Sequence, residues 1–200
     1  MRFIYGFVFA LALLAGAVIA AVKTGEMPAN ADSKASFLEK WVARTSLEAT
    51  IQRDSKGLKN PLQPTSENLS AGVKLYAENC TACHGASDGK PSNMAQGFSI
   101  GAPQLAKDGV TDDPVTESYW KIKHGIRFTA MPAFTTTLTD EQIWQLAMFV
   151  ATMDKLPPDV DSEWKAVPSA AVAAVPNAAA PAAPTVAASA DPNAEASQSP

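Results

Sequence analysis

The longest uninterrupted apolar run stands at the N-terminus of the chain. From Phe3 to Val22 no charged residue occurs, and Arg2 and Lys23 flank the run. As a helix that rises 1.5 Å per residue, it would cover roughly 30 Å, the thickness of a bilayer's hydrocarbon core. The pattern therefore predicts a membrane anchor within residues 1–23.

A cleaved signal peptide is the alternative interpretation of this segment. Ala29, Asn30 and Ala31 have the small-x-small form of a cleavage site. However, the apolar run exceeds the roughly 7 to 15 residues of a typical signal-peptide core, which favours the anchor. Both interpretations send the rest of the chain across the membrane. We expect a membrane-anchored domain in the periplasm, or a soluble periplasmic one after cleavage.

A linker with helical periodicity follows at 24–64. Its apolar residues recur among charged ones at roughly helical spacing, at Phe37, Leu38, Trp41, Val42, Leu47 and Ile51. We expect an amphipathic helix between Ser33 and Arg53, ending before Pro61 and Pro64. Such a helix serves either as a stalk packed on the next domain or as a surface for the membrane or a partner subunit.

The compact domain is expected at 65–157, and its first and last helices have distinct signatures. Leu69, Val73 and Tyr76 share one face of the first helix. Thr139 and Gln142 form a capping box that opens the last helix, whose following positions are mostly apolar. The sequence thus predicts two amphipathic helices at the ends of one domain.

Between these two helices, a third helix and an irregular loop are expected. The third runs from Asp113 to His124, with Asp113 as its cap, Pro114 at its first position and Gly125 beyond its end. The stretch 85–102 lacks periodicity and predicts a loop. Residues 158–200 are rich in Ala and Pro and predict a disordered tail.

Charge excludes one class of partner. The chain has 16 basic and 20 acidic residues, a net charge of -4. A protein that binds nucleic acid through its phosphates usually carries a strongly basic surface. We therefore expect no nucleic-acid partner.

The two cysteines of the chain define its chemistry. Cys80, Cys83 and His84 form a C-x-x-C-H motif, the pattern of c-type haem attachment. Two thiols one helical turn apart can add to the two vinyl groups of one porphyrin, and the adjacent histidine then lies beneath the iron. The motif occurs once, so we expect one covalent haem, with His84 as an iron ligand.

Two other uses of a C-x-x-C pair fit less well. A thioredoxin-like redox pair requires a strand before the motif and a helix after it. A zinc site requires two more ligands, and His124 is the only other histidine. Haem attachment is the interpretation that the residues favour.

From about Thr65 to Leu156 the sequence resembles the class I cytochrome c family. The resemblance rests on the C-x-x-C-H motif, on the spacing of Gly72 and Tyr76 before it, and on Met131-Pro132 before the last helix. It implies an all-α cytochrome c fold in which the N- and C-terminal helices cross around one covalently bound haem. Gly72 would lie at that crossing.

The resemblance also implies the remaining site residues. Met131 would be the second iron ligand, and a Met/His pair raises the reduction potential relative to two imidazoles. Met94 and His124 are the competing ligands. The carbonyl of Pro103 would accept a hydrogen bond from the ring of His84 and fix its orientation.

With both axial positions filled, the iron has no open site for a substrate, which favours an electron carrier over an enzyme. We expect single-electron transfer between redox donor and acceptor proteins of a membrane-associated respiratory chain. One alternative is an electron-entry subunit of a larger oxidoreductase complex. Another is a haem-based sensor in which Met131 is displaced.

Overall fold

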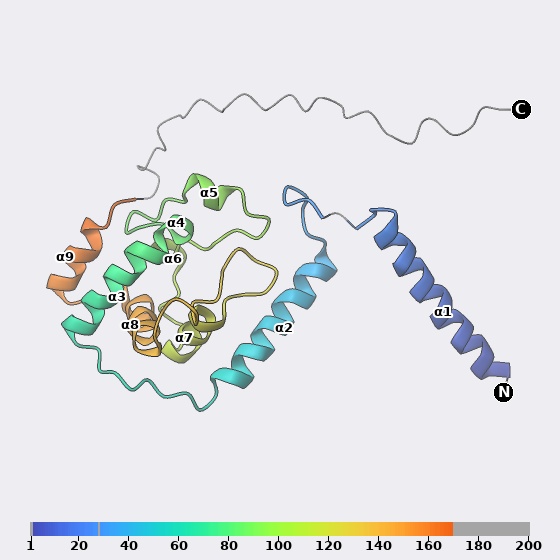
Figure 1. Ribbon diagram of the computed structural model, residues 1–200, viewed down its shortest axis with the longest axis horizontal. Coiled ribbons are helices and arrows are strands. Elements are labelled where there is room, and N and C mark those ends of the chain that lie inside the picture. The colour runs from blue at the N-terminus through green and yellow to red at the C-terminus, as the bar shows by residue number, and fades with distance from the viewer. Residues whose placement is uncertain (1, 28, 170–200) are drawn as a thin grey trace, which may run out of the picture.

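The computed structural model describes residues 2–27 and 29–169, and all regular secondary structure within them is helical (Figure 1). The order of elements confirms the predicted all-α class. The helices are α1 (Arg2–Lys23), α2 (Phe37–Ser55), α3 (Ser66–Asn79), α4 (Thr81–His84), α5 (Asn93–Gln96), α6 (Leu105–Asp108), α7 (Val115–His124), α8 (Asp140–Thr152) and α9 (Pro158–Ala166).

Helices α3 and α8 pack directly against each other at Gly72. A Cβ atom at this position would come within 2.5 Å of the Gln145 carbonyl oxygen and 2.6 Å of the Phe149 Cβ. The two backbones therefore approach more closely than any larger residue permits. Leu69, Val73 and Tyr76 on α3 lie in the same core as the apolar face of α8, as their spacing predicts.

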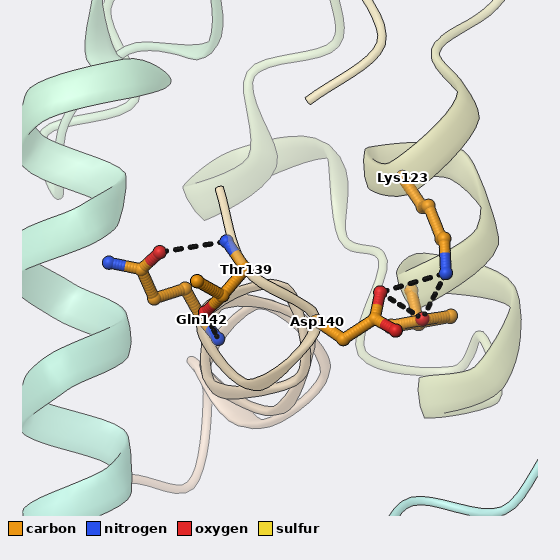
Figure 2. Close-up of polar contacts among 5 residues, drawn as sticks. Lys123, Thr139, Asp140 and Gln142 are labelled. Atoms are coloured by element: carbon orange, nitrogen blue, oxygen red, sulfur yellow. Dashed lines mark hydrogen bonds and ion pairs between the residues drawn. The ribbon is translucent and has the colours of Figure 1, made fainter. Parts of the chain in front are cut away.

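Helix α8 begins with the predicted capping box. The Thr139 hydroxyl accepts from the Gln142 backbone N–H, and the Gln142 side chain accepts from the Thr139 backbone N–H at 2.8 Å. Figure 2 shows this pair beside a second contact, in which Lys123 of α7 donates to Asp140 at 2.8 Å. The capping box thus stabilises the first turn of α8, and the Lys123–Asp140 contact connects that turn to α7.

The start of α7 differs from the sequence prediction. The helix begins at Val115 with Pro114 as its N-cap residue, and no side chain caps it. Asp113, the expected cap, lies before the helix and instead forms a 2.5 Å ion pair with Lys121 of α7. The Asp113 carboxylate could either cap the helix or pair with the partly buried lysine. In the structure it pairs with the lysine.

The compact domain extends beyond the predicted boundary at 157. Helix α9 lies within the segment expected to be a disordered tail, yet Val160 and Trp164 are 0% and 4% exposed. The Trp164 ring lies edge-on against both Tyr76 and Phe149, with ring centroids 5.1 Å apart in each pair. Two buried side chains suffice to hold this short polar helix, which explains why composition did not reveal it. The Ala/Pro-rich remainder, 170–200, lies outside the described residues.

The N-terminal part forms two separate helices. Helix α1 is long and apolar enough to span a membrane. An 18-residue stretch within it has a mean hydropathy of 2.5, and none of that stretch is buried. A signal sequence has the same features, so the helix is compatible with both predicted roles. Helix α2 begins at a capping box of Ser36 and Glu39, and its C-terminal half packs on α7. That contact agrees with the predicted stalk.

Candidate functional site

The C-x-x-C-H motif continues directly from the end of α3. The Cys80 backbone N–H donates to the Tyr76 carbonyl at 2.9 Å, and the His84 N–H donates to the Cys80 carbonyl at 2.8 Å. These bonds wind Cys80, Cys83 and His84 around one helical turn, the short helix α4. Both thiols are free. The local helix therefore keeps two thiols and one imidazole within one turn of each other.

The thiols are poorly suited to redox exchange. Burial and, to a smaller extent, the neighbouring Cys83 raise the pKa of Cys80 to about 12. Burial also raises the pKa of Cys83. Disulfide exchange proceeds through a thiolate, which these environments disfavour at neutral pH. Among the described residues, moreover, no three His, Cys, Asp or Glu side chains group to bind a metal ion such as zinc.

The His84 ring is oriented by a residue distant in sequence. Its Nδ1 lies 2.9 Å from the Pro103 carbonyl oxygen. A carbonyl only accepts, so Nδ1 carries the hydrogen and Nε2 keeps its lone pair. Burial lowers the pKa of His84, and the bond to Pro103 partly opposes this shift. The imidazole is therefore neutral at pH 7, with one nitrogen available to a metal.

Two further side chains, Tyr76 and Gln104, hold the backbone around His84. The sequence marked Tyr76 only for its helix face and its spacing before the motif, and it did not mark Gln104. The Tyr76 hydroxyl donates to the Gly85 carbonyl at 3.0 Å and lies 3.3 Å from that of His84. The Gln104 amide donates to the Cys83 carbonyl at 3.3 Å. Burial raises the pKa of Tyr76, so the phenol stays protonated and able to donate. The backbone of the motif is thus fixed from two sides.

Gly85 marks the tightest point of this loop. Its φ is +73°, and a Cβ there would lie 2.8 Å from the Lys90 carbonyl oxygen and would meet the Gln104 amide oxygen. That Gln104 oxygen is buried and has no hydrogen-bond partner among the described residues. The loop after the motif accordingly packs against the backbone of Gly85, where only glycine fits.

Met131 lies in a loop that returns along the end of α7. Its N–H donates to the Thr129 hydroxyl at 3.1 Å, and its carbonyl accepts from the Ile126 N–H at 3.2 Å. A Cβ on Gly125 would lie 2.5 Å from the Pro132 carbonyl carbon, so the loop crosses directly over that glycine. Met131 itself is partly buried against the core. Its backbone is therefore held in a fixed, tight turn.

The competing ligands have different surroundings. Met94, on the short helix α5, is 54% exposed. His124 is exposed at the end of α7, and its ring lies 5.1 Å from that of Trp120. Tyr119, also on α7, is stacked on Trp144, with ring centroids 3.8 Å apart. Met131 differs from both alternatives in that it is partly buried against the core.

Comparison with known proteins adds independent evidence. Residues 67–150 match the family model described as cytochrome C oxidase, cbb3-type, subunit III. The chain is 31% identical over 83 residues to cytochrome c6 of Parathermosynechococcus lividus, covering 42% of this chain and 87% of that protein. It is 33% identical over 86 residues to cytochrome c6 of Leptolyngbya boryana, covering 42% and 89%.

The chain belongs to the class I c-type cytochromes. As a member of this family it is an electron-transfer protein with covalently bound haem c. The residues present fit that group. They offer two free thiols one turn apart, a neutral imidazole with a free nitrogen, and a neutral thioether in a tight loop. These are the kinds of donor that a haem of this type takes.

This cytochrome also resembles one subunit of an oxidase. It is 34% identical over 97 residues to the cbb3-type cytochrome c oxidase subunit FixP of Rhizobium meliloti, covering 46% of this chain. The match spans only 29% of the FixP chain. No solved structure matches this cytochrome at comparable stringency.

Proposed function

We propose that this cytochrome is a single-haem electron carrier, held at the periplasmic face of a membrane by α1, that exchanges electrons with membrane-bound redox complexes. The observation that carries the site assignment is the contact between His84 Nδ1 and the Pro103 carbonyl oxygen, at 2.9 Å. It leaves Nε2 of a neutral, oriented imidazole free for iron.

In this proposal each site residue has a defined task. Cys80 and Cys83 would hold the haem by thioether bonds, and His84 and Met131 would ligate its iron. Pro103 fixes the tautomer and the plane of the His84 ring. The bound haem supplies a one-electron couple between ferric and ferrous iron. The Tyr76 hydroxyl and the Thr129 hydroxyl hold the backbone at Gly85 and at Met131, so His84 and Met131 would keep their positions when the iron changes its charge.

The ligand set is tested by absorption spectra of protein made with cytochrome c maturation. Acid-acetone extraction should leave one haem per chain bound. The oxidised protein should show the weak sulfur-to-iron charge-transfer band, and the reduced protein should be low-spin and should not bind carbon monoxide at neutral pH. Covalent haem without that band, together with carbon monoxide binding, would remove Met131 from the site and favour a sensor.

A second candidate function is the electron-entry subunit of an oxidase complex. The similarity to FixP and to the cbb3-type subunit III family model favours it. Purification of the native chain from membranes in a mild detergent separates the two functions. A carrier should elute alone, whereas a subunit should elute with stoichiometric partners that contain further haem.

A further inference from the structure

Helix α2 has two different apolar faces, and only one of them contacts the haem domain. Ile51 and Ser55, 4% and 7% exposed, and the partly buried Leu47 are spaced four residues apart on the side that packs against α7. These residues all belong to the C-terminal half of the helix. The buried residues of α2 therefore all lie in its C-terminal half.

The N-terminal half of α2 exposes a cluster of large apolar side chains. Phe37, Leu38, Trp41 and Val42 are 84%, 64%, 56% and 51% exposed. At about 100° per residue they share one face, rotated by roughly 110° from the face that holds Leu47, Ile51 and Ser55. We call these four residues the α2 apolar patch. Four adjacent exposed apolar side chains, two of them aromatic, are typical of a contact surface.

The chain itself indicates what covers this patch. Only residues 24–36 separate it from Lys23, the end of the candidate membrane span α1. Fully extended, 13 residues reach at most about 45 Å, and a flexible chain of that length averages about 20 Å between its ends. If α1 spans the bilayer, the patch therefore stays within about 45 Å of the membrane surface, and on average within about 20 Å.

The composition of the patch suits the boundary between lipid headgroups and acyl chains. Tryptophan is enriched there because its ring is apolar and its N–H is polar. Lys40 and Arg44, in the same half of α2, lie about 130° and 90° around the helix from the centre of the patch, which therefore carries no charge of its own. A helix with these features lies in the interface rather than across the membrane.

We infer that the N-terminal half of α2 lies in the headgroup–acyl boundary of the membrane that holds α1, with Phe37, Leu38, Trp41 and Val42 inserted. This inference rests on the membrane-anchored carrier proposed above. Because the other half of α2 is fixed to α7, the helix acts as a strut that sets the height and tilt of the haem domain above the membrane. The occupant of the patch is a lipid surface.

Trp41 provides a direct probe of insertion. The haem-loaded full-length chain is placed in nanodiscs made of ordinary or brominated phosphatidylcholine and phosphatidylglycerol, and tryptophan emission is compared. The contribution of Trp41 is the difference between wild type and Trp41→Phe. Brominated lipids should reduce that difference by at least about half. An unchanged difference, with α1 shown by co-flotation to be inserted, overturns the inference.

A pair of charge variants supplies the matched control. Trp41→Glu introduces a carboxylate into the patch, whereas Ala43→Glu introduces one at an exposed position outside it. In nanodiscs, tryptic cleavage after Lys40 and Arg44 should be several-fold faster in Trp41→Glu than in wild type or Ala43→Glu. Equal cleavage rates in all three proteins contradict an inserted patch.

Two outcomes separate this inference from the proposed anchor. N-terminal sequencing of the native chain shows whether α1 is retained. If it is removed, the anchored carrier fails, and flotation of the processed chain with the same vesicles then tests the patch: flotation lost in Trp41→Glu supports insertion, and absent flotation overturns it. Protection of Lys40 and Arg44 only after membrane complexes are added would assign the patch to a protein partner and also overturn the inference.

Discussion

The indole of Trp164 meets the ring of Tyr76 edge-on, with the two ring centroids 5.1 Å apart. The hydroxyl of the same Tyr76 donates to the Gly85 carbonyl at 3.0 Å. A helix at the far end of the domain is therefore in contact, through one side chain, with the backbone that follows the haem-attachment motif. This relationship makes α9 part of the cytochrome domain.

Replacement of Trp164 should consequently destabilise the whole domain. Trp164→Ala removes a buried indole and two edge-on ring contacts, and such truncations cost about 3 to 5 kcal/mol of the free energy of unfolding. Urea unfolding of the haem-loaded protein measures the loss. Trp164→Phe should lose less, and Glu163→Ala, at the exposed neighbouring position, should change little. If Trp164→Ala unfolds like Glu163→Ala, α9 does not stabilise the domain.

Gly72 should tolerate no side chain. The Cβ of Gly72→Ala would meet the Gln145 carbonyl oxygen at 2.5 Å, so α3 and α8 would have to separate. Overpacking of this kind costs about 1 to 3 kcal/mol. Gly101→Ala is the matched control, because a Cβ there meets nothing within 4 Å and its φ is not in the left-handed region. The control should be neutral or slightly stabilising. Equal midpoints of thermal unfolding for the two variants would show that the helices can shift without cost.

Met131 and Met94 should respond differently to the same substitution. Met131→Ala should keep covalent haem but lose the sulfur-to-iron band, and its reduction potential should fall, because the thioether ligand favours ferrous iron. Met94→Ala, which shortens an exposed methionine, should keep the band and the potential of wild type. Spectra and redox titration measure both. The reverse pattern would assign the ligand to Met94.

The contact between α7 and α8 should make stability depend on acid pH. The hydrogen bonds from Lys123 and then Tyr119 lower the pKa of Asp140 from 3.8. A carboxyl with a lowered folded-state pKa stabilises the fold above its unfolded pKa, and this contribution disappears as the pH falls through the lowered value. The Asp140 side chain is largely solvent-exposed, so the effect should be modest.

Asp140→Asn tests this contribution. The difference in thermal midpoint between wild type and Asp140→Asn should be constant near neutral pH and should shrink below about pH 4, the range in which the carboxyl protonates. Glu141→Gln controls for the loss of a negative charge in the first turn of α8, where the helix dipole also favours an acid. A difference that persists unchanged to pH 2 would mean that the charge of Asp140 is not what stabilises the contact.

Local patterns were sufficient to predict much of this protein. The apolar run from Phe3 to Val22, the capping box of Thr139 and Gln142, and the Cys80–Cys83–His84 spacing all express interactions within a few residues along the chain, or within one long apolar segment. Such features depend on residue spacing and composition, which can be read directly from the sequence. They were enough to indicate the helical class and the haem chemistry.

Only the tertiary structure decided how the distant parts meet. The contact between His84 and Pro103 joins residues 19 positions apart and needed a family resemblance to anticipate. The burial of Trp164 against Tyr76 had no local signal, because a lone tryptophan in a polar segment packs only if a complementary surface folds beside it. Likewise, whether Asp113 caps α7 or pairs with Lys121 depends on side-chain placement in the folded domain. Long-range packing selects among conformations that the local sequence leaves open.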